Sequence, residues 1–183
     1  AMQRNEPLGQ AKALLYEHFG YSSFRGAQET LISAILSGKD ALGIMPTGAG
    51  KSICYQIPGL MLPGITLVVS PLISLMQDQV RALKAAGIAG AYLNSSLSYK
   101  QYVRALDNAR KGMYKIIYVA PERLVTGEFQ SFAASVPISL VAVDEAHCVS
   151  QWGHDFRPSY MNIAPFVEML PTRPVLAAFT ATA

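Results

Sequence analysis

One stretch of the chain, residues 43–52, combines glycines with a lysine and a hydroxyl side chain at close spacing. It follows a short apolar run that is typical of a buried strand. Glycines let backbone N–H groups turn toward phosphate oxygens, Lys51 adds a positive charge, and the Ser52 hydroxyl can bind Mg2+. A helix that begins here adds the partial positive charge of its N-terminus. The stretch predicts a phosphate-binding loop whose triphosphate-binding residues are Thr47, Gly48, Ala49, Gly50, Lys51 and Ser52.

The loop departs from the pattern G-x-x-x-x-G-K-S/T at one position, because Met45 stands where the first glycine is expected. The loop alone therefore leaves an alternative open, a Gly-rich turn between a strand and a helix with an ordinary surface lysine. Residues far along the chain bear on the choice.

A pair of acids, Asp144 and Glu145, directly follows the apolar run 140–143. A carboxylate at the end of a buried strand is costly unless it serves a cation or a hydrogen-bond network. Beside a triphosphate, Asp144 would hold Mg2+ together with Ser52, and Glu145 would orient the attacking water and accept its proton. Taken alone, the pair could instead be a helix N-cap followed by a first-turn acid.

The composition fits a single globular domain: 183 residues, 51% hydrophobic and 15% charged. A net charge of +3 permits a polyanionic partner without requiring one. Cys54 and Cys148 have no metal-ligand spacing, so we expect neither a zinc site nor a disulfide scaffold, and a reducing compartment. No apolar run is long enough for a membrane span and no signal peptide is present, so we expect a cytoplasmic protein without a membrane partner.

Hydrophobic periodicity predicts strands that alternate with helices, and therefore an α/β fold with a mainly parallel sheet flanked by helices. Pro58 should kink or end the helix that follows the loop, and Ser98 with Gln101 has the spacing of a capping box. That last helix should bury Tyr99, Tyr102, Val103 and Leu106. The expected strands are 41–45, 65–69, 89–93, 115–119, 140–143 and 175–179. The expected helices lie at 8–19, 51–62, 72–86 and from 99 onward, with another that runs through Leu31, Ile32, Ile35 and Leu36 and stops at Gly38.

Polar residues follow five of these strands at their carboxyl ends. In parallel sheets ligands bind along that edge, so we expect the residues after positions 45, 69, 119, 143 and 179 to meet there.

Five segments in order along the chain resemble motifs I, Ia, Ib, II and III of superfamily 2 helicases. They are MPTGAGKS, VSPLISLMQDQ, YVAPERL, VDEAH and AFTATA. More narrowly, YSSFRGAQ before them and CVSQWGHDFRPSY after VDEAH are similar to the RecQ family of DNA helicases. The resemblance extends from about residue 8 to residue 183. It implies a RecA-like P-loop NTPase lobe that uses ATP and Mg2+, in a parent protein that unwinds DNA 3'–5' in repair and recombination.

The resemblance also implies residue roles. Tyr21, Arg25 and Gln28 correspond to the motif that recognises adenine, whereas Phe24 could equally be a core aromatic. Lys51, Asp144 and Glu145 fall on the catalytic positions, with Ser52 and Asp144 on the metal. Thr180 and Thr182 match motif III, whose hydroxyls can bond His147 or the motif II acid and couple nucleotide state to DNA. The alternative is a polar strand end that bonds its own backbone.

The loop 150–158 holds the only tryptophan and resembles the aromatic-rich loop of the RecQ family. Its displayed aromatics can stack on unpaired bases, and Arg157 can bond phosphate or sense the bound nucleotide. Burial of Trp152 and Phe156 to pin the loop is the alternative. The DNA and coupling residues implied in total are Ser70, Pro71, Arg123, His147, Trp152, His154, Phe156, Arg157, Thr180 and Thr182. Ser70, Pro71 and Arg123 could instead form plain strand-to-helix caps.

Nothing in the chain resembles a second helicase lobe or the zinc-binding and winged-helix regions. We therefore expect residues 1–183 to form a single lobe, whose partners are the second lobe of the same parent and single-stranded or partly duplex DNA. Alone it should bind Mg-nucleotide weakly, hydrolyse ATP poorly and not unwind DNA. Two alternatives remain, an RNA helicase lobe and a nucleotide-gated nucleic-acid-binding module without hydrolysis. In a bacterial parent the protein would be associated with the nucleoid.

Overall fold

The computed structural model describes residues 2–46 and 49–181, with side chains from Glu6 onward except that of Ala49. Thr47, Gly48 and Thr182, which were predicted as site residues, lie outside the described residues. The helices are α1 (Met2–Phe19), α2 (Gln28–Leu36), α3 (Ala49–Met61), α4 (Ile73–Ala85), α5 (Tyr99–Arg110), α6 (Gly127–Ser135) and α7 (Ile163–Met169). Short 3-10 helices are η1 (Pro121–Val125), η2 (Ala146–Val149) and η3 (Pro158–Asn162).

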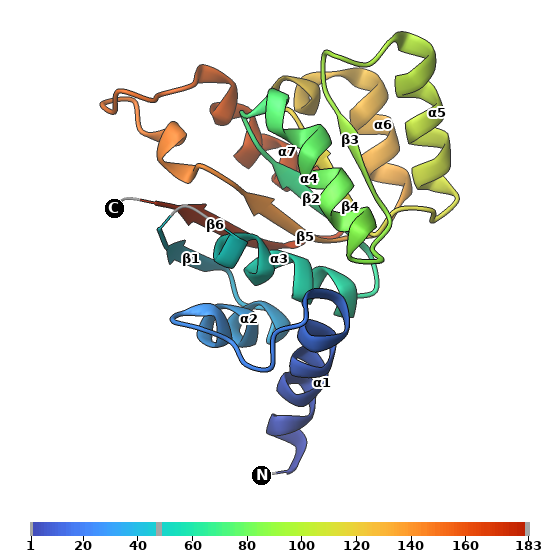
Figure 1. Cartoon of the computed structure of the whole chain (residues 1–183). Coiled ribbons are helices and arrows are strands. Elements are labelled where there is room, and N and C mark those ends of the chain that lie inside the picture. Colours follow the sequence, from blue (N-terminus) through green and yellow to red (C-terminus); the bar gives the residue numbers. More distant parts are fainter. Residues whose placement is uncertain (1, 47–48, 182–183) are drawn as a thin grey trace.

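The strands are β1 (Ala41–Ile44), β2 (Ile65–Val69), β3 (Gly90–Leu93), β4 (Ile116–Val119), β5 (Ile138–Val143) and β6 (Val175–Thr180). Within the described residues they form one sheet of order β1-β6-β5-β2-β4-β3, and every neighbouring pair is parallel. The predicted parallel α/β architecture is confirmed. In Figure 1 the sheet crosses the middle of the molecule, with α1 and α2 below it and α5 and α6 at the upper right.

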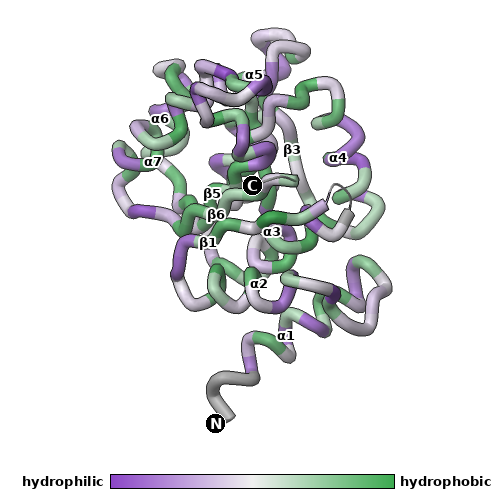
Figure 2. The backbone as a smooth tube through the Cα atoms, turned by 90° about the vertical axis from the view of Figure 1, so that its left-hand side faces the viewer, coloured by the Kyte–Doolittle hydropathy of each residue, from purple (hydrophilic) through white to green (hydrophobic). Residues whose placement is uncertain are grey.

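Helices cover both faces of the sheet, because alternate strand residues point to opposite sides. In β5, Val141 and Val143 pack with α5, α6 and α7, whereas Leu140 and Ala142 pack with α2, α3 and α4. Helix α1 adds an outer layer on α2 and α3. Figure 2 shows the hydrophobic strands β5, β6 and β1 between these layers. The result is a three-layer fold, as expected.

Local sequence signals set the helix ends. Gly20, Gly38 and Gly87 follow α1, α2 and α4 with φ of 77°, 81° and 80°, a conformation that glycine adopts without strain. Ser98 and Gln101 form the predicted capping box of α5. Helix α1 begins earlier than expected, at Met2, a stretch with weak hydrophobic periodicity.

Pro58 was expected to kink or end the helix after the loop. It does not end α3, which continues to Met61, and the Leu62 N–H donates to the Pro58 carbonyl at 2.9 Å. One expectation about α5 was wrong. Tyr99 does not join the buried face of α5 and is 69% exposed, because at the first helical position its ring turns outward and its hydroxyl donates to Glu128 at 3.2 Å.

Both cysteines, Cys54 and Cys148, are buried free thiols. Their spacing in the sequence had not indicated a disulfide scaffold. Burial raises the pKa of Cys54 to about 12, so its thiol is protonated at neutral pH. None of the helices within residues 2–46 and 49–181 has the length and hydropathy needed to cross a bilayer.

Candidate ATP and nucleic-acid site

The carboxyl ends of five strands meet at one edge of the sheet. Ile44 of β1 lies beside Thr180 of β6, and Val69 of β2 lies between Val119 of β4 and Val143 of β5. Because the strands are parallel and in register, the loops that follow them emerge side by side. The predicted convergence of polar segments is therefore confirmed.

Lys51 lies between the two motif II acids at this edge. Its Nζ is 2.9 Å from Asp144 Oδ1 and 3.1 Å from Glu145 Oε1. Lys51 is 7% exposed and Asp144 5% exposed. Burial alone would lower the pKa of Lys51, but hydrogen bonds and charge contacts with Asp144 and Glu145 raise it above its ordinary value. Lys51 is therefore a cation at neutral pH, and the reading of this residue as an ordinary surface lysine is wrong.

Backbone geometry presents the two acids side by side. Among the described non-glycine residues Glu145 alone has a positive φ, 52°, in the left-handed region that such residues seldom occupy. The turn is held by the Glu145 N–H, which donates to Asp144 Oδ1 at 3.0 Å, and by the Tyr160 hydroxyl, which donates to the Asp144 carbonyl at 2.7 Å. Strained backbone of this kind is common at functional sites. Neither Asp144 nor Glu145 is an N-cap with a side-chain bond, so the plain capping alternative is not what the structure contains.

A row of buried polar side chains lies behind the acid–lysine contacts. The Tyr55 hydroxyl lies 2.9 Å from the Tyr118 hydroxyl, and Gln56 Nε2 donates to the Tyr118 hydroxyl at 3.3 Å. Burial, followed by the neighbouring Tyr118, holds the pKa of Tyr55 well above its usual range. Tyr55 therefore keeps its proton, and this buried row joins α3 to β4. Tyr118 is far from Tyr55 and Gln56 in the sequence, and these residues were not predicted to meet.

The side chains at this site have the chemistry that Mg2+ prefers. Mg2+ binds oxygen ligands and usually takes one or two from protein and the rest from phosphate and water. Asp144 offers a buried carboxylate and Ser52 a half-buried hydroxyl. Among the described residues no group of three or more His, Cys, Asp or Glu forms a metal-binding cluster. This donor set fits a metal that is shared with a bound triphosphate.

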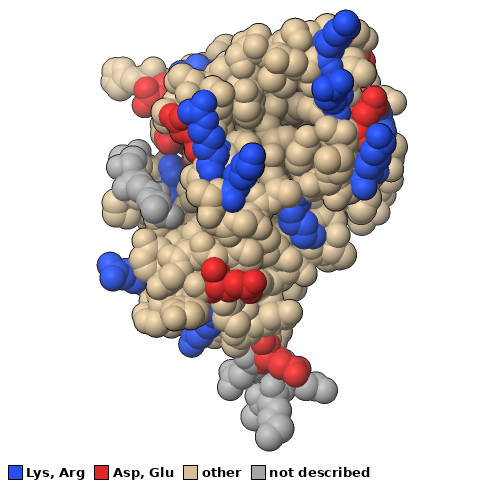
Figure 3. Space-filling model, turned by 45° about the vertical axis from the view of Figure 1, so that its right-hand side comes forward, with Lys and Arg blue, Asp and Glu red and all other residues tan. Residues whose placement is uncertain are grey.

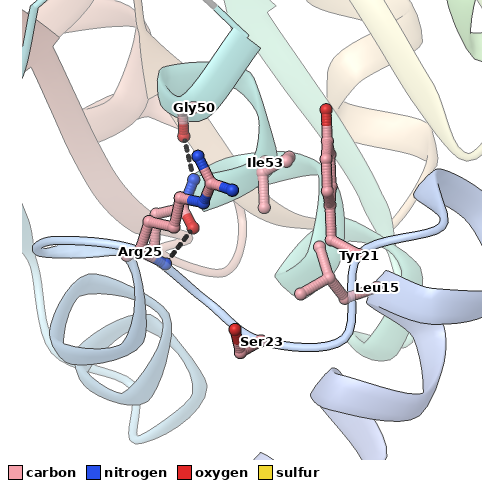
Figure 4. A pocket seen from close by; sticks show the side chains of 7 residues that line it. Leu15, Tyr21, Ser23, Arg25, Gly50 and Ile53 are labelled. Atoms are coloured by element: carbon pink, nitrogen blue, oxygen red, sulfur yellow. Dashed lines mark hydrogen bonds between the residues drawn. The ribbon is translucent and has the colours of Figure 1, made fainter.

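A pocket of about 140 Å³ lies between the loop after α1 and the start of α3, and Figure 4 shows its lining. The pocket residues are Leu15, Tyr21, Ser23, Arg25, Gln28, Gly50 and Ile53. The Gln28 amide ties it together, because Nε2 donates to the Gly50 carbonyl at 3.0 Å and Oε1 accepts from the Arg25 N–H at 2.8 Å. The three predicted adenine-binding residues are thus brought to one pocket, which Gly50 of the predicted phosphate-binding loop also lines.

The neighbouring aromatics differ in their surroundings. Tyr21 is 48% exposed and lines the pocket, whereas Phe24 packs against the cluster formed by α1, α2 and α3. The core alternative for Phe24 is therefore correct. Stacking of adenine on Tyr21 and pairing of its edge with Gln28 remain predictions.

His147 joins the acid pair to two other segments. Its Nδ1 lies 3.0 Å from Thr180 Oγ1, a hydrogen bond whose direction depends on the tautomer. Its Nε2 lies 3.6 Å from Glu145 Oε2 and 3.6 Å from Asp155 Oδ2. The predicted contact between His147 and motif III is confirmed for Thr180. Asp155 was not selected from the sequence, although it lies inside the loop segment that carried the resemblance.

The loop 150–158 displays its aromatic residues. Trp152 is 92% exposed, so the alternative in which it is buried to pin the loop is wrong; Phe156 is half-buried. An open groove of about 420 Å³ beside it includes His154, Phe156 and Arg157 in its lining. The Arg157 N–H bonds the Cys148 carbonyl at 3.0 Å and anchors the loop, while the Arg157 side chain is exposed.

The loops after β2, β3 and β4 are connected through Asn94, which the sequence analysis missed. Asn94 is 1% exposed, its Nδ2 lies 3.5 Å from the Ile73 carbonyl, and its own carbonyl accepts from Arg123 at 3.1 Å. Arg123 also stacks on the Tyr102 ring, 4.5 Å from the centroid. The sequence signal that could have identified Asn94 is the run of polar residues, Asn94-Ser95-Ser96, directly after the strand.

Ser70 and Pro71 lie in the turn between β2 and α4. Ser70 is buried and its hydroxyl accepts from the Leu72 N–H at 3.2 Å; Pro71, next to it, is half-buried. The N-cap of α4 is Leu72, so neither residue caps the helix. Backbone contacts to DNA at these positions remain predictions.

Comparisons with known proteins agree with this geometry. Residues 25–183 match the DEAD/DEAH box helicase family. The chain is 51% identical over 177 residues to the ATP-dependent DNA helicase RecQ of Bacillus subtilis, covering 96% of this chain and 30% of that protein. It is 50% identical over 178 residues to RecQ of Pasteurella multocida, covering 97% of this chain and 28% of that protein. The chain thus spans less than a third of the length of these relatives.

Solved structures share the fold at lower identity. A hypothetical ATP-dependent RNA helicase from Sulfolobus tokodaii has a TM-score of 0.70 and 24% identity, over 97% of this chain and 51% of that one. Mycobacterium smegmatis helicase Lhr bound to ssDNA and AMP-PNP has a TM-score of 0.71 and 23% identity, over 97% of this chain and 25% of that one. The sequence-based resemblance to RecQ helicases and the RecA-like fold class are confirmed. The chain belongs to the DEAD/DEAH box helicase family.

Proposed function

We propose that this chain is the first RecA-like lobe of a RecQ-type ATP-dependent DNA helicase, in which it binds ATP and Mg2+ and couples hydrolysis to DNA. The observation that carries the proposal is the contact of Lys51 with both Asp144 and Glu145 at the carboxyl edge of the sheet. The pocket formed by Tyr21, Gln28 and their neighbours includes Gly50, the residue before Lys51. Relatives that are about half identical bear the name of this helicase.

Lys51 would exchange partners when nucleotide binds. Its Nζ contacts two carboxylates, and a triphosphate would offer it phosphate oxygens instead. Moving Lys51 to the phosphates frees both carboxylates: Asp144 with Ser52 would hold Mg2+, and Glu145 would orient the attacking water and accept its proton. The metal, when bound, neutralises charge on the phosphate oxygens.

His147 would carry the state of the acid pair to the DNA side. It contacts Glu145, Thr180 and Asp155, so a shift of the Glu145 carboxylate changes the surroundings of both motif III and the loop 150–158. Thr182, which follows Thr180, is proposed to share this role. Trp152 and Phe156 would stack on bases, with His154, Arg157, Arg123, Ser70 and Pro71 along the DNA path.

We further propose that a second lobe of the same parent completes the ATP site. The chain spans about 30% of the length of its relatives, and the pocket of about 140 Å³ is smaller than the roughly 300 Å³ at the lower end of ligand sites. A second lobe would add an arginine to the transferring phosphate, a contribution of about 10³ to 10⁵ in rate. Alone, the lobe would bind Mg-nucleotide weakly and hydrolyse ATP poorly.

The parent would act on single-stranded and partly duplex DNA, with 3'–5' unwinding in repair and recombination in the cytoplasm. An RNA helicase is the nearest alternative, and the RecQ-like loop around the exposed Trp152 favours DNA. A module that binds nucleotide without hydrolysis is disfavoured, since Lys51, Asp144 and Glu145 are all present and in contact. Hydrolysis by the parent measured with DNA and with RNA of the same length separates the first two.

The test of nucleotide binding uses the chain itself. Titration with a fluorescent ATP analogue and Mg2+ should give saturable binding that ATP displaces, and Lys51→Ala should abolish it because the triphosphate loses its cation. Lys39→Ala, which removes an exposed lysine, is the matched control and should bind normally. Equal binding by the Lys51→Ala variant would refute the proposed role, and strand separation by the isolated chain would refute the need for a second lobe.

A further inference from the structure

Helix α5 and its C-cap, residues 99–111, hold an unusual share of the charge of the chain. The segment contains Lys100, Arg104, Arg110 and Lys111 against the single acid Asp107, a net charge of +3. The whole chain has 15 Lys and Arg against 12 Asp and Glu, also +3. The remaining residues therefore balance at 11 basic and 11 acidic. Figure 3 shows basic side chains at the upper right of one face of the molecule and others toward its centre and left.

Three of these basic residues lie on one outward face. Lys100, Arg104 and Lys111 are spaced i, i+4 and i+11, which places them within about 40° of one another around a helix. All three are exposed and line an open groove of about 360 Å³, while Tyr102 and Leu106 on the opposite face are buried. The stripe extends for about 16 Å along the helix, since each residue adds about 1.5 Å.

Among the described residues these three cations have no acidic partner. Within the part of the chain that the structure describes, Asp107 pairs with Arg110 at 3.1 Å, and none of Lys100, Arg104 and Lys111 forms an ion pair. Lys100 also stands in the first turn of α5, just after the N-cap Ser98, where the helix dipole favours acids and disfavours a cation. Helix stability therefore does not explain this residue.

The stripe of Lys100, Arg104 and Lys111 begins near the strand-end edge, which is the edge of the sheet where the carboxyl ends of the strands meet. Helix α5 begins directly after the loop that Arg123 holds through the Asn94 carbonyl, and Arg123 stacks on Tyr102 of α5 itself. The cations then run from that edge along the flank of the molecule. A polyanion bound across the strand-end edge could therefore extend onto these three basic residues.

We propose that Lys100, Arg104 and Lys111 form a second DNA-contacting surface that binds the phosphodiester backbone of the strand leaving the strand-end edge. Because this inference rests on the proposed function, DNA is favoured over an acidic protein segment. A single strand advances about 3.4 Å per nucleotide along a duplex axis, so the stripe corresponds to about five nucleotides. Such contacts position the nucleic acid and carry no sequence information.

The experiment measures binding of the chain to a labelled single-stranded oligonucleotide by fluorescence anisotropy, between about 50 and 200 mM salt. A variant with Lys100→Gln, Arg104→Gln and Lys111→Gln should show a plot of log K against log salt that is shallower by about 2, and by about 3 on duplex DNA. The matched control removes the same charge at three exposed lysines elsewhere, Lys12→Gln, Lys39→Gln and Lys84→Gln, and should keep the wild-type slope. Circular dichroism checks that both variants are folded.

The outcomes separate the two proposals. Equal slopes for the variant and the wild-type chain overturn the α5 surface and leave the proposed function intact, and so does an equal loss in the control. The same titration is repeated with a labelled polyglutamate peptide. If the triple variant loses binding to polyglutamate but keeps its binding to DNA, the DNA surface is overturned in favour of an acidic protein partner. Absence of DNA binding by the wild-type chain overturns this inference and leaves the nucleotide-binding part of the proposed function intact, because that part is tested by titration with the ATP analogue.

Discussion

The acid–lysine centre and the loop 150–158 lie at the same edge of the sheet but are built in opposite ways. Lys51 and Asp144 are less than 10% exposed and are bonded to each other, whereas Trp152 is 92% exposed. Buried strands hold the first region on both sides, and a few backbone bonds such as that from Arg157 to Cys148 hold the second. A centre that performs chemistry needs fixed geometry, while a surface that receives a flexible strand needs accessible rings.

The two regions are joined at few points. His147 contacts Glu145 on one side and Asp155 on the other, and Tyr160, which follows the loop, donates to the Asp144 carbonyl. If the division is correct, substitutions in the centre should remove hydrolysis, substitutions in the loop should remove its dependence on DNA, and substitutions at the joints should affect both.

The largest effect is expected for Glu145→Gln in a parent chain that includes a second lobe. The amide keeps the size of the side chain but cannot accept the proton of the attacking water. Hydrolysis should fall by about 10² to 10⁴ while ATP still binds. Single-turnover hydrolysis and nucleotide titration measure the two steps separately. Loss of binding equal to the loss of hydrolysis would assign Glu145 a structural role.

Trp152→Ala should affect only the DNA side. Each stacked base contributes about 1 to 3 kcal/mol, so half-maximal stimulation of hydrolysis should need roughly 5 to 150 times more single-stranded DNA. Nucleotide binding should be unchanged, because the exposed Trp152 side chain takes no part in the contacts of Lys51. Tyr16→Ala removes an aromatic ring that is 67% exposed on α1 and is the matched control. Unchanged stimulation in the Trp152 variant would remove this residue from the DNA path.

Tyr160→Phe tests a joint between the regions. The change deletes one buried hydroxyl and leaves the Asp144 carbonyl without that donor, so stability should fall by about 0.5 to 1.5 kcal/mol. Hydrolysis and its stimulation by DNA should both decline several-fold, as expected for a positioning residue. Denaturant unfolding and a DNA titration of hydrolysis provide the two readouts. A loss of stability with normal coupling would limit Tyr160 to packing.

The smallest effect is expected at the opposite edge of the sheet, where Asp40 bonds Arg173 and the Leu176 N–H. The hydrogen bond from Arg173, then that from Leu176, lowers the pKa of Asp40 below its ordinary 3.8. This carboxylate therefore stabilises the fold above pH 3.8, and its contribution is lost as the pH falls through the lowered value. Asp40→Asn should slightly lower the thermal midpoint at pH 7 and flatten its decline in acid. Altered nucleotide binding by this variant would argue against the separation of the edges.

Much of the fold followed from local patterns in the sequence. The strand 65–69 was predicted with its observed bounds, because periodicity acts within a few residues. Gly20, Gly38 and Gly87 follow three helices with positive φ for a similarly local reason. The expected roles of Lys51 toward phosphate and of Asp144 toward Mg2+ placed both residues at one site, but the direct ion pair between them was not predicted.

Contacts between loops were harder to anticipate. Asp155, Tyr160 and Asn94 reach partners that only the packed strands bring near, so their spacing in the sequence carries little signal. Trp152 left two interpretations open for the same reason, since a tryptophan in a polar loop can either pin the loop or be displayed. The Tyr99 error has a local cause, because the first position of a helix can point its side chain outward.

One measurement tests most directly whether this lobe carries one wall of an ATP site that is coupled to DNA. Steady-state ATP hydrolysis is measured with and without single-stranded DNA, on this chain and on the same chain extended through a second lobe. The account predicts slow, DNA-independent hydrolysis by the chain and fast, DNA-stimulated hydrolysis by the extended protein. Equal DNA-stimulated hydrolysis by both proteins, or none by the extended one, would contradict it.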